Sequence, residues 1–158
     1  MDLDPVDKYH HHAEKCFDVL HQHAANPERD TRRLFLWMLF SYWVGNGDLH
    51  LKNLALVGSE SDGALRLSPA YDLVSTYLYG DEKMALYING KERDLRRGDF
   101  HLLGEAGGLT RTEVDEVMTG MLSAQCVLLE IVGRSLLSEG LKESYRQLLR
   151  KRKRALLL

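Results

Sequence analysis

Three oxygen-bearing side chains stand at spacings that could support phosphoryl transfer. Asp48 and Asn53 lie five positions apart, and Asp72 follows 24 positions after Asp48. Phosphoryl transfer needs one carboxylate to orient the attacking hydroxyl, and further hard oxygen ligands to hold Mg²⁺ against the phosphates. In the protein-kinase pattern, a catalytic aspartate and a metal-binding asparagine are also five positions apart, and a later aspartate is the second metal ligand. The spacing in this sequence agrees with that requirement.

Both segments that carry these side chains are polar and rich in turn-forming residues. Residues 45–53 read GNGDLHLKN, directly after a very apolar stretch. Gly45 and Gly47 permit backbone angles that other residues resist, so a loop is expected here. Residues 69–73 read PAYDL and contain the later aspartate.

A short strand pair is expected between the two loops. Residues 54–57 and 65–67 have the pattern of short strands, and the segment 58–63 that joins them is rich in turn-forming residues. A strand pair brings its two outer ends together. We therefore expect the three oxygen-bearing side chains to converge in space.

On these motifs the sequence closely resembles the C-terminal kinase domain of the HipA family, which are bacterial toxin kinases of toxin–antitoxin modules. The resemblance is specific over residues 40–56 and 67–73, 24 of the 158 residues. The family's catalytic loop, G-N-x-D-x-H-x-K-N, and its P-A-Y-D-L metal segment both stand here intact. The G-D-x-H-x-x-N core also resembles the phosphatidylinositol kinase loop, and G-D-L-H resembles aminoglycoside and choline phosphotransferases. A small-molecule phosphotransferase is therefore one alternative.

The resemblance implies a serine/threonine protein kinase that uses ATP and Mg²⁺. Carried over by position, Asp48 would be the catalytic base, and Asn53 and Asp72 would be the Mg²⁺ ligands. An isolated Asp48 could simply cap a turn, but the joint pattern argues against that simpler role.

Three further residues of the two loops receive roles from the resemblance. His50 would act in catalysis or near the phosphates, with ordering of the loop as the alternative. Lys52 would contact a phosphate, with a solvated side chain as the alternative. Tyr71 is placed beside the cofactor, with packing as the alternative. Ser75 and Thr76 are either phosphate acceptors or helix caps.

The sequence departs from a complete kinase in its first 44 residues. No glycine precedes Gly45, and the upstream lysines, Lys8 and Lys15, do not lie in a strand-like context. The glycine-rich lid and the strand lysine of a kinase are thus not found. We expect residues 1–158 to form one HipA-like C-terminal lobe without the nucleotide-covering N-terminal lobe, as a fragment, a truncated frame or one half of a split kinase.

The resemblance also implies partners. These are a separate N-lobe chain, a HipB-like helix-turn-helix antitoxin, and an aminoacyl-tRNA synthetase as protein substrate. DNA would be reached only indirectly, through the antitoxin. The alternative function from a different class is a non-catalytic module that docks the antitoxin or the operator complex.

The elements around the loops are expected to be mainly helical, in a mostly α (α+β) unit with short β-hairpins. The expected helices are 6–24, 31–44, 99–106, 111–137 and 139–158. Asp4-Pro5 should start the first helix, and Asp30 or Thr31 should cap the second. A short strand is expected at 84–88, before an Asn89-Gly90 turn, and a capping box at 110–113.

Composition and charge set the broad class. Hydrophobic residues make up 44% and charged residues 28%, as in ordinary globular proteins. The net charge of −2 gives no global attraction to nucleic acid or to an anionic membrane. The acidic first residues do not resemble a secretory signal, and no stretch is expected to reach the roughly 18 apolar residues of a membrane span. A cytoplasmic protein without a membrane partner is expected.

Three smaller features have competing interpretations. The basic run 146–154 is either the solvated face of a terminal helix or a partner- or phosphate-binding tail. Cys16 and Cys126 are expected to be small buried hydrophobes. The histidine run 10–12 is not expected to form a metal site, because consecutive helical side chains point about 100° apart.

Overall fold

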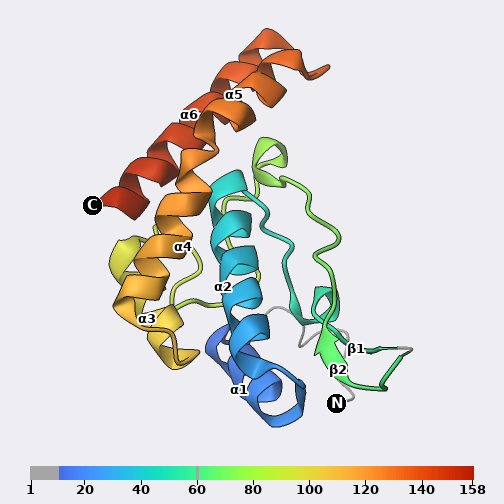
Figure 1. Cartoon of the computed structure of the whole chain (residues 1–158). Helices are drawn as coiled ribbons and strands as arrows, with labels where there is room; N and C mark the ends of the chain where they lie inside the picture. The colour runs from blue at the N-terminus through green and yellow to red at the C-terminus, as the bar shows by residue number, and fades with distance from the viewer. Residues whose placement is uncertain (1–10, 60) are drawn as a thin grey trace.

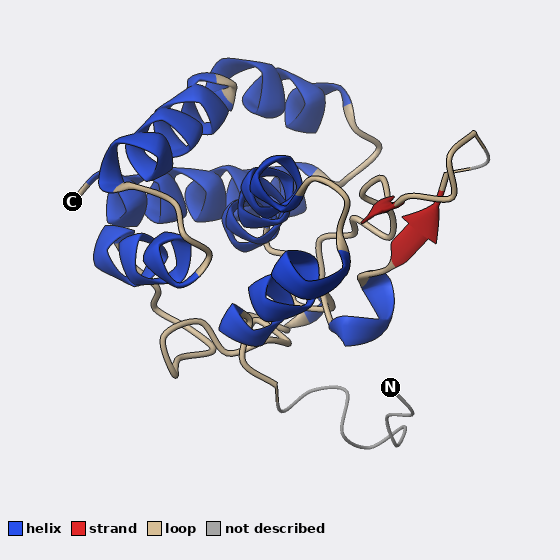
Figure 2. Cartoon of the chain, turned by 60° about the horizontal axis from the view of Figure 1, so that its bottom comes forward, coloured by secondary structure: helices blue, strands red, loops and turns tan. Residues whose placement is uncertain are grey.

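Helix α2 (Pro27–Val44) runs through the middle of the molecule, and elements from both ends of the chain pack on it (Figure 1). The structure is a computed structural model that describes residues 11–59 and 61–158. The other elements are α1 (Glu14–His23), η2 (Leu51–Asn53), β1 (Leu56–Gly58), β2 (Leu65–Leu67), η3 (Tyr77–Tyr79), α3 (Arg97–Ala106), α4 (Arg111–Ser123), α5 (Gln125–Arg134) and α6 (Glu139–Leu157). Helices form most of the molecule, and the sheet is a small hairpin at its edge (Figure 2). The expected mostly α (α+β) class is confirmed.

The core is built around α2 because this helix is apolar on nearly every side. It contacts α1, α3, α4, α6 and β2. Leu34, Phe35 and Trp43 are at most 1% exposed, although they point in different directions from the helix axis. A helix that is apolar all round is stable only when it is buried, as the sequence predicts.

The start of α2 differs from the expectation. The cap is Asn26, whose Oδ1 accepts a hydrogen bond from the Arg29 amide at 3.0 Å, and Pro27 occupies the first helical position. Asp30 and Thr31 lie inside the helix and are buried. The expected cap at Asp30 or Thr31 is therefore wrong, because Asn26-Pro27 starts the helix instead of only breaking the preceding one.

Helix α6 packs on the C-terminal end of α2 and provides partners for its last carbonyls. The Tyr145 hydroxyl donates to the Val44 carbonyl at 2.7 Å, and the Arg152 guanidinium donates to the Tyr42 carbonyl. The last carbonyls of a helix have no partner within the helix, and a cation there interacts favourably with the helix dipole. Helix α6 therefore fixes the point at which the chain leaves α2.

The strand pair forms as expected, with β1 antiparallel to β2 and Leu56 opposite Leu67. The expected strand at 84–88 is reduced to isolated bridges, although Asn89 and Gly90 do form a turn with positive φ angles of 49° and 71°. The expected first helix is wrong for its residues 11–13. His12 forms a parallel bridge with Tyr87, and Ala13 is the cap residue, so the helix begins only at Glu14. Its predicted start at Asp4-Pro5 lies outside the described residues.

Helices α4 and α5 replace the single long helix that was expected, with a break at Ala124. The Thr110 capping box is confirmed. By length and composition alone, the stretch Arg111–Arg134 could cross a membrane, with a mean hydropathy of 1.3 over a window that is 22% buried. The expectation that no stretch would qualify is therefore wrong. The apolar residues of α4 pack in the core, whereas Val127 and Ile131 of α5 are exposed.

The two cysteines have different environments. Burial raises the pKa of the Cys16 thiol to about 12, with smaller contributions from Glu14 and Asp18, so this thiol is an unreactive packing group. Cys126 lies on α5 and is exposed, so the expectation that both are buried is wrong for Cys126.

Candidate active site

The loop that follows α2 is fixed by two glycines for two different reasons. Gly45 ends the helix at φ 77°, and a Cβ added there would lie 2.8 Å from Tyr77 Cβ. Gly47 is instead required for space, because a Cβ there would lie 2.5 Å from the Lys83 carbonyl oxygen. Its amide donates to the Thr76 hydroxyl at 2.9 Å. The backbone at these positions is therefore held against residues 75–83.

Asn46 joins the two loops and was not singled out from the sequence. Its side chain is fully buried. Its Oδ1 accepts from the Asp48 amide at 3.0 Å, and its Nδ2 donates to the Asp72 carbonyl at 3.5 Å. The position of Asn46 within the GNGDLHLKN motif could have marked it as a site residue. Its contact with Asp72, 26 residues later, is not visible in the sequence.

Asn53 and Asp72 are in direct contact. Asn53 Nδ2 donates to Asp72 Oδ2 at 2.7 Å, and Asn53 Oδ1 accepts from the His50 amide at 3.0 Å. Asn53 is 4% exposed, whereas the Asp72 carboxylate is on the surface. A buried amide therefore holds an accessible carboxylate in a fixed position, and the chain brings these two predicted ligands together.

Asp72 adopts an unusual backbone conformation, with φ 56°. Few residues other than glycine enter this region, and aspartate is one that tolerates it. Such conformations persist where the surroundings impose them, often at functional sites. Here the imposed conformation directs the carboxylate toward Asn53.

Asp48 and His50 lie on the same loop, with Asp48 Oδ1 3.9 Å from His50 Nε2. The Asp48 side chain is 51% exposed and that of His50 is 11% exposed. The histidine is therefore the inner residue of the pair. The accessible Asp48 carboxylate can receive a hydrogen bond from an incoming hydroxyl.

The loop that carries Asp72 is anchored to the core by an ion pair at the start of α2. Arg33 Nη1 contacts the Asp30 carboxylate at 3.0 Å, and the same guanidinium donates to the carbonyls of Leu67 and Ser68. The Asp30 carboxylate accepts from the Leu67 amide at 2.9 Å. This ion pair fixes the strand end that leads into the loop.

Tyr71 and Lys52 are joined through the backbone. The Tyr71 hydroxyl donates to the Lys52 carbonyl at 3.0 Å, and its ring lies edge-on to Trp37 at 6.0 Å. The structure thus gives Tyr71 a contact that links the two loops. The Lys52 side chain is exposed at the rim of an apolar hollow of about 490 Å³ between α1, α2 and β2.

Ser75 and Thr76 contact the backbone of the catalytic loop. The Thr76 hydroxyl accepts from Gly47, and both hydroxyls lie within 3.5 Å of the Gly45 carbonyl. Their contacts therefore stabilise the loop, and the expected helix cap is wrong for Thr76, whose side chain makes no cap hydrogen bond at the start of η3.

The oxygen donors of this site suit Mg²⁺ bound together with a phosphate ligand. Within residues 11–59 and 61–158, no group of three or more His, Cys, Asp or Glu side chains could hold a metal ion by itself. Mg²⁺ is commonly held by one or two carboxylates, with substrate phosphates and water completing the shell. Asp72 offers an accessible carboxylate for such a partial shell, and the Asn53 oxygen, which already accepts from the His50 amide, has one further lone pair for it, so the donor set fits the ion.

Comparison with known proteins gives one family. A family model described as the HipA-like C-terminal domain matches residues 1–127. "Putative kinase Y4mE" of Sinorhizobium fredii is 37% identical over 86 residues, which cover 53% of this chain and 20% of that protein. "Putative kinase Y4dM" of the same organism is 47% identical over 59 residues, which cover 36% of this chain and 14% of that protein.

The fold is also found among solved structures. A chain of the Shewanella oneidensis MR-1 toxin–antitoxin complex of HipA, HipB and operator DNA matches with a TM-score of 0.76 and 24% identity. The match covers 93% of this chain and 36% of that one. The fold is therefore shared along nearly the whole chain, which spans between 14% and 36% of the length of these relatives.

Proposed function

The chain belongs to the HipA-like C-terminal domain family, whose members are toxin–antitoxin kinases, and we propose that it is the lobe that holds the acceptor hydroxyl and Mg²⁺ for transfer of the ATP γ-phosphate. The acceptor would be a serine or threonine hydroxyl of a protein. The relatives named as kinases support the reaction class. The assignment of roles to individual residues depends on the geometry of the two loops.

The hydrogen bond between Asn53 and Asp72 is the observation that carries this proposal. These residues are 19 positions apart and come from different loops, yet their side chains meet at 2.7 Å. Burial of Asn53 and the strained backbone of Asp72 are both costly unless the arrangement is maintained by its surroundings. A kinase needs an asparagine and an aspartate side by side at its metal site, and this hydrogen bond holds Asn53 and Asp72 next to each other.

Each residue then has a distinct task. Asp48 would accept the proton, or orient the hydroxyl, of the protein substrate, because its carboxylate is accessible. Asn53 and Asp72 would hold Mg²⁺, which when bound neutralises charge on the phosphates. His50 would keep the Asp48 loop in place from its inner side, and Lys52 would contact a phosphate from the rim.

Binding of the ATP nucleotide would be the task of a protein region outside this lobe. The relatives are several times longer than the region matched here. We propose that a nucleotide-covering lobe, in the same or a separate chain, supplies the contacts to ATP that the 158 residues lack. An aminoacyl-tRNA synthetase is the substrate implied by the family resemblance.

The first experiment separates metal binding from transfer. With a nucleotide-covering lobe and a non-hydrolysable ATP analogue supplied, Mn²⁺ binding to the full chain beyond that of the analogue alone, measured by electron paramagnetic resonance, should weaken strongly in Asp72→Asn and stay unchanged in Asp62→Asn, a surface control in the β1–β2 turn. Asp48→Asn should keep Mn²⁺ binding. It should lower phosphate transfer at least ~10²-fold when a nucleotide-covering lobe is supplied, as expected for loss of a general base. Transfer that is unaffected by Asp48→Asn would refute the role given to Asp48.

A second proposal concerns the partner. The solved complex that shares the fold contains HipB and operator DNA. We propose that this chain likewise takes a small helix-turn-helix antitoxin as partner and reaches DNA only through it. In a gel-shift assay with such an antitoxin, the chain should shift the antitoxin–DNA complex but not DNA alone. A shift of DNA alone that is lost on deleting residues 147–158 would favour the direct, non-catalytic binding module instead.

A further inference from the structure

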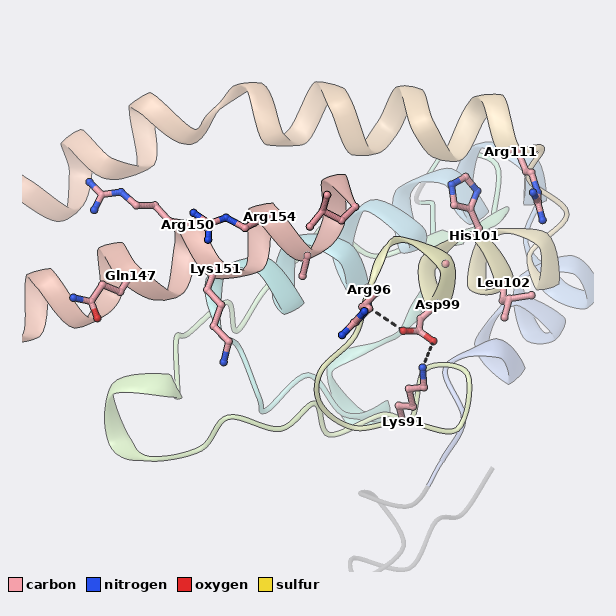
Figure 3. A pocket seen from close by; sticks show the side chains of 13 residues that line it. Lys91, Arg96, Asp99, His101, Leu102, Arg111, Gln147, Arg150, Lys151 and Arg154 are labelled. Carbon is pink, nitrogen blue, oxygen red and sulfur yellow. Dashed lines mark hydrogen bonds and ion pairs between the residues drawn. The ribbon is translucent and has the colours of Figure 1, made fainter.

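The basic run near the C-terminus is divided between the core and one hollow. Arg152 is buried, and Lys153 donates to the Leu122 carbonyl at 3.1 Å, so both have structural partners. Other cations of the same helix line a hollow of about 990 Å³ (Figure 3): Arg150, Lys151 and Arg154. The lining of this hollow contains neither Asp48 nor Asp72.

Cations from three other places line the same hollow. Lys91 and Arg96 come from the loops before α3, and Arg111 comes from the start of α4. Figure 3 shows the Arg96 and Lys151 side chains extending into the space between α6 and the loop that carries Lys91. Six basic side chains from separate elements therefore surround one volume.

The first turn of α3 adds further positive potential. Gly98 lines the hollow, and open space lies where its Cβ would be. The first amides of a helix have no acceptor within the helix, and the helix dipole places partial positive charge at this end. An anion in the hollow would therefore lie near this helix end, where Asp99 already accepts from the Arg96 amide.

The acidic groups nearby leave part of this charge unbalanced. Asp99, the acidic residue in the lining, is already bound by Lys91 at 2.7 Å and by the Arg96 amide at 2.9 Å. Arg111 and Arg150 contact Glu105 and Glu143. Among the described residues, no carboxylate lies within ion-pair distance of three lining cations: Arg96, Lys151 and Arg154.

From these observations we propose that the hollow binds a small polyphosphate anion, either inorganic or the phosphate chain of a nucleotide. Its size is that of a small-molecule pocket rather than of a surface that follows a duplex. Leu102 and Ala155 give it an apolar wall, against which the body of a nucleotide could rest. The site shares no residue with the proposed kinase site and does not depend on it.

Titration of the full chain with inorganic tripolyphosphate, with EDTA present to remove Mg²⁺, tests this proposal. Lys151→Gln/Arg154→Gln should weaken binding at least ~10-fold, because charge-assisted contacts are lost. The control Lys15→Gln/Arg134→Gln removes the same charge from exposed positions outside the hollow and should bind as the wild type does. Absence of binding to the wild type, or equal weakening in both double variants, would overturn the proposal.

Further arms identify the source of the phosphates. If ATP in EDTA binds more tightly than tripolyphosphate, and Leu102→Ser weakens ATP alone, the ligand is a nucleotide; equal affinities identify an inorganic anion. Asp72→Asn should leave tripolyphosphate binding unchanged, so that failure of the kinase proposal and failure of this one are distinguishable. Displacement of tripolyphosphate by a short duplex DNA at equal phosphate concentration would overturn the assignment to a small anion.

Discussion

The Asp30 carboxylate, inside α2, accepts a 2.9 Å hydrogen bond from the amide of Leu67, at the end of β2. Asp30 is 2% exposed, and its other oxygen contacts Arg33 at 3.0 Å. Since Leu67 begins the segment that ends at Asp72, this bond connects the buried helix α2 to the proposed metal-binding loop. A residue outside both motifs thus determines where one of them lies.

Asp30→Ala should destabilise the chain by about 1.5–3 kcal/mol, because the Leu67 amide loses its partner and the Arg33 charge loses its counterion. Denaturant unfolding measures the loss, and hydrogen exchange at Leu67 should become faster. Asp18→Ala, an exposed change on α1, is the matched control and should stay within about 0.5 kcal/mol of the wild type. Equal stability of the two variants would contradict the anchoring role.

Gly47→Ala should cost about 1–3 kcal/mol, because the added methyl group must displace the Lys83 carbonyl or the Thr76 hydroxyl. The comparison is Gly120→Ala, in the middle of α4, where a Cβ meets nothing within 4 Å. That change should stabilise the chain by about 0.5–1 kcal/mol, since alanine favours the helix. Thermal unfolding of both variants decides. A neutral Gly47→Ala would mean that the loop has room that the structure does not show.

Local sequence patterns were sufficient for the elements around the site. The apolar run of α2, the strand pair and the Thr110 capping box each follow from periodicity or from residue types at short range. The contact between Asn53 and Asp72 was also within reach, because a strand pair returns the chain to its starting point. Such features depend on residues fewer than about 20 positions apart.

What could not be predicted depends on partners far along the chain. Aspartate is a common helix-capping residue, so the sequence suggests a cap at Asp30. Only the contact with the Leu67 amide, 37 residues later, shows that Asp30 instead holds the end of β2 from inside α2. The helical pattern continues before α1, but His12 is paired with Tyr87 in a bridge and the helix begins only at Glu14. In the run 146–154, helical spacing places Arg152 on the same face as Leu148 and Leu149, but the carbonyls of Tyr42 and Glu82 that satisfy its charge lie 70 or more residues away. Tertiary contacts overrode local preference in each case.

Arg152→Gln should destabilise the chain by roughly 1.5–3 kcal/mol. Its guanidinium donates to the carbonyls of Tyr42 and Glu82 and lies 4.6 Å from the centre of the Tyr42 ring. Burial lowers the pKa of Arg152, and Tyr42 opposes that shift. The neutral variant would leave the end of α2 without its cation.

The control for this prediction is Arg150→Gln, two positions away on the same helix, whose side chain is 54% exposed. It should change the free energy of unfolding by no more than about 0.5 kcal/mol. Chemical denaturation of the two variants side by side is the measurement. If the two variants lose the same free energy of unfolding, the basic run 146–154 would stabilise the chain through its net charge and not through the contacts of Arg152 with α2.

Asp99 gives the fold an acid-sensitive contact at the start of α3. Burial by itself would raise the pKa of this carboxyl, but hydrogen bonds from Lys91, Asn89 and the Arg96 amide outweigh it and hold the pKa below the ordinary value of 3.8. A carboxyl with a lowered pKa in the folded state binds fewer protons there than in the unfolded chain, so stability rises with pH in this range. Its contribution is complete above pH 3.8 and is lost as the pH falls through the folded-state value.

Asp99→Asn should therefore be less stable than the wild type by about 1.5–3 kcal/mol at neutral pH, because the charge-assisted bonds to Lys91 and the Arg96 amide are weakened. The difference should shrink once the pH falls below 3.8, since the wild-type carboxyl becomes protonated and is then itself a neutral partner. Urea unfolding of both proteins at a series of pH values isolates this group, because every other carboxyl is common to the two chains. A difference that stays constant into the acid range would show that the side chain acts through its shape and not through its charge.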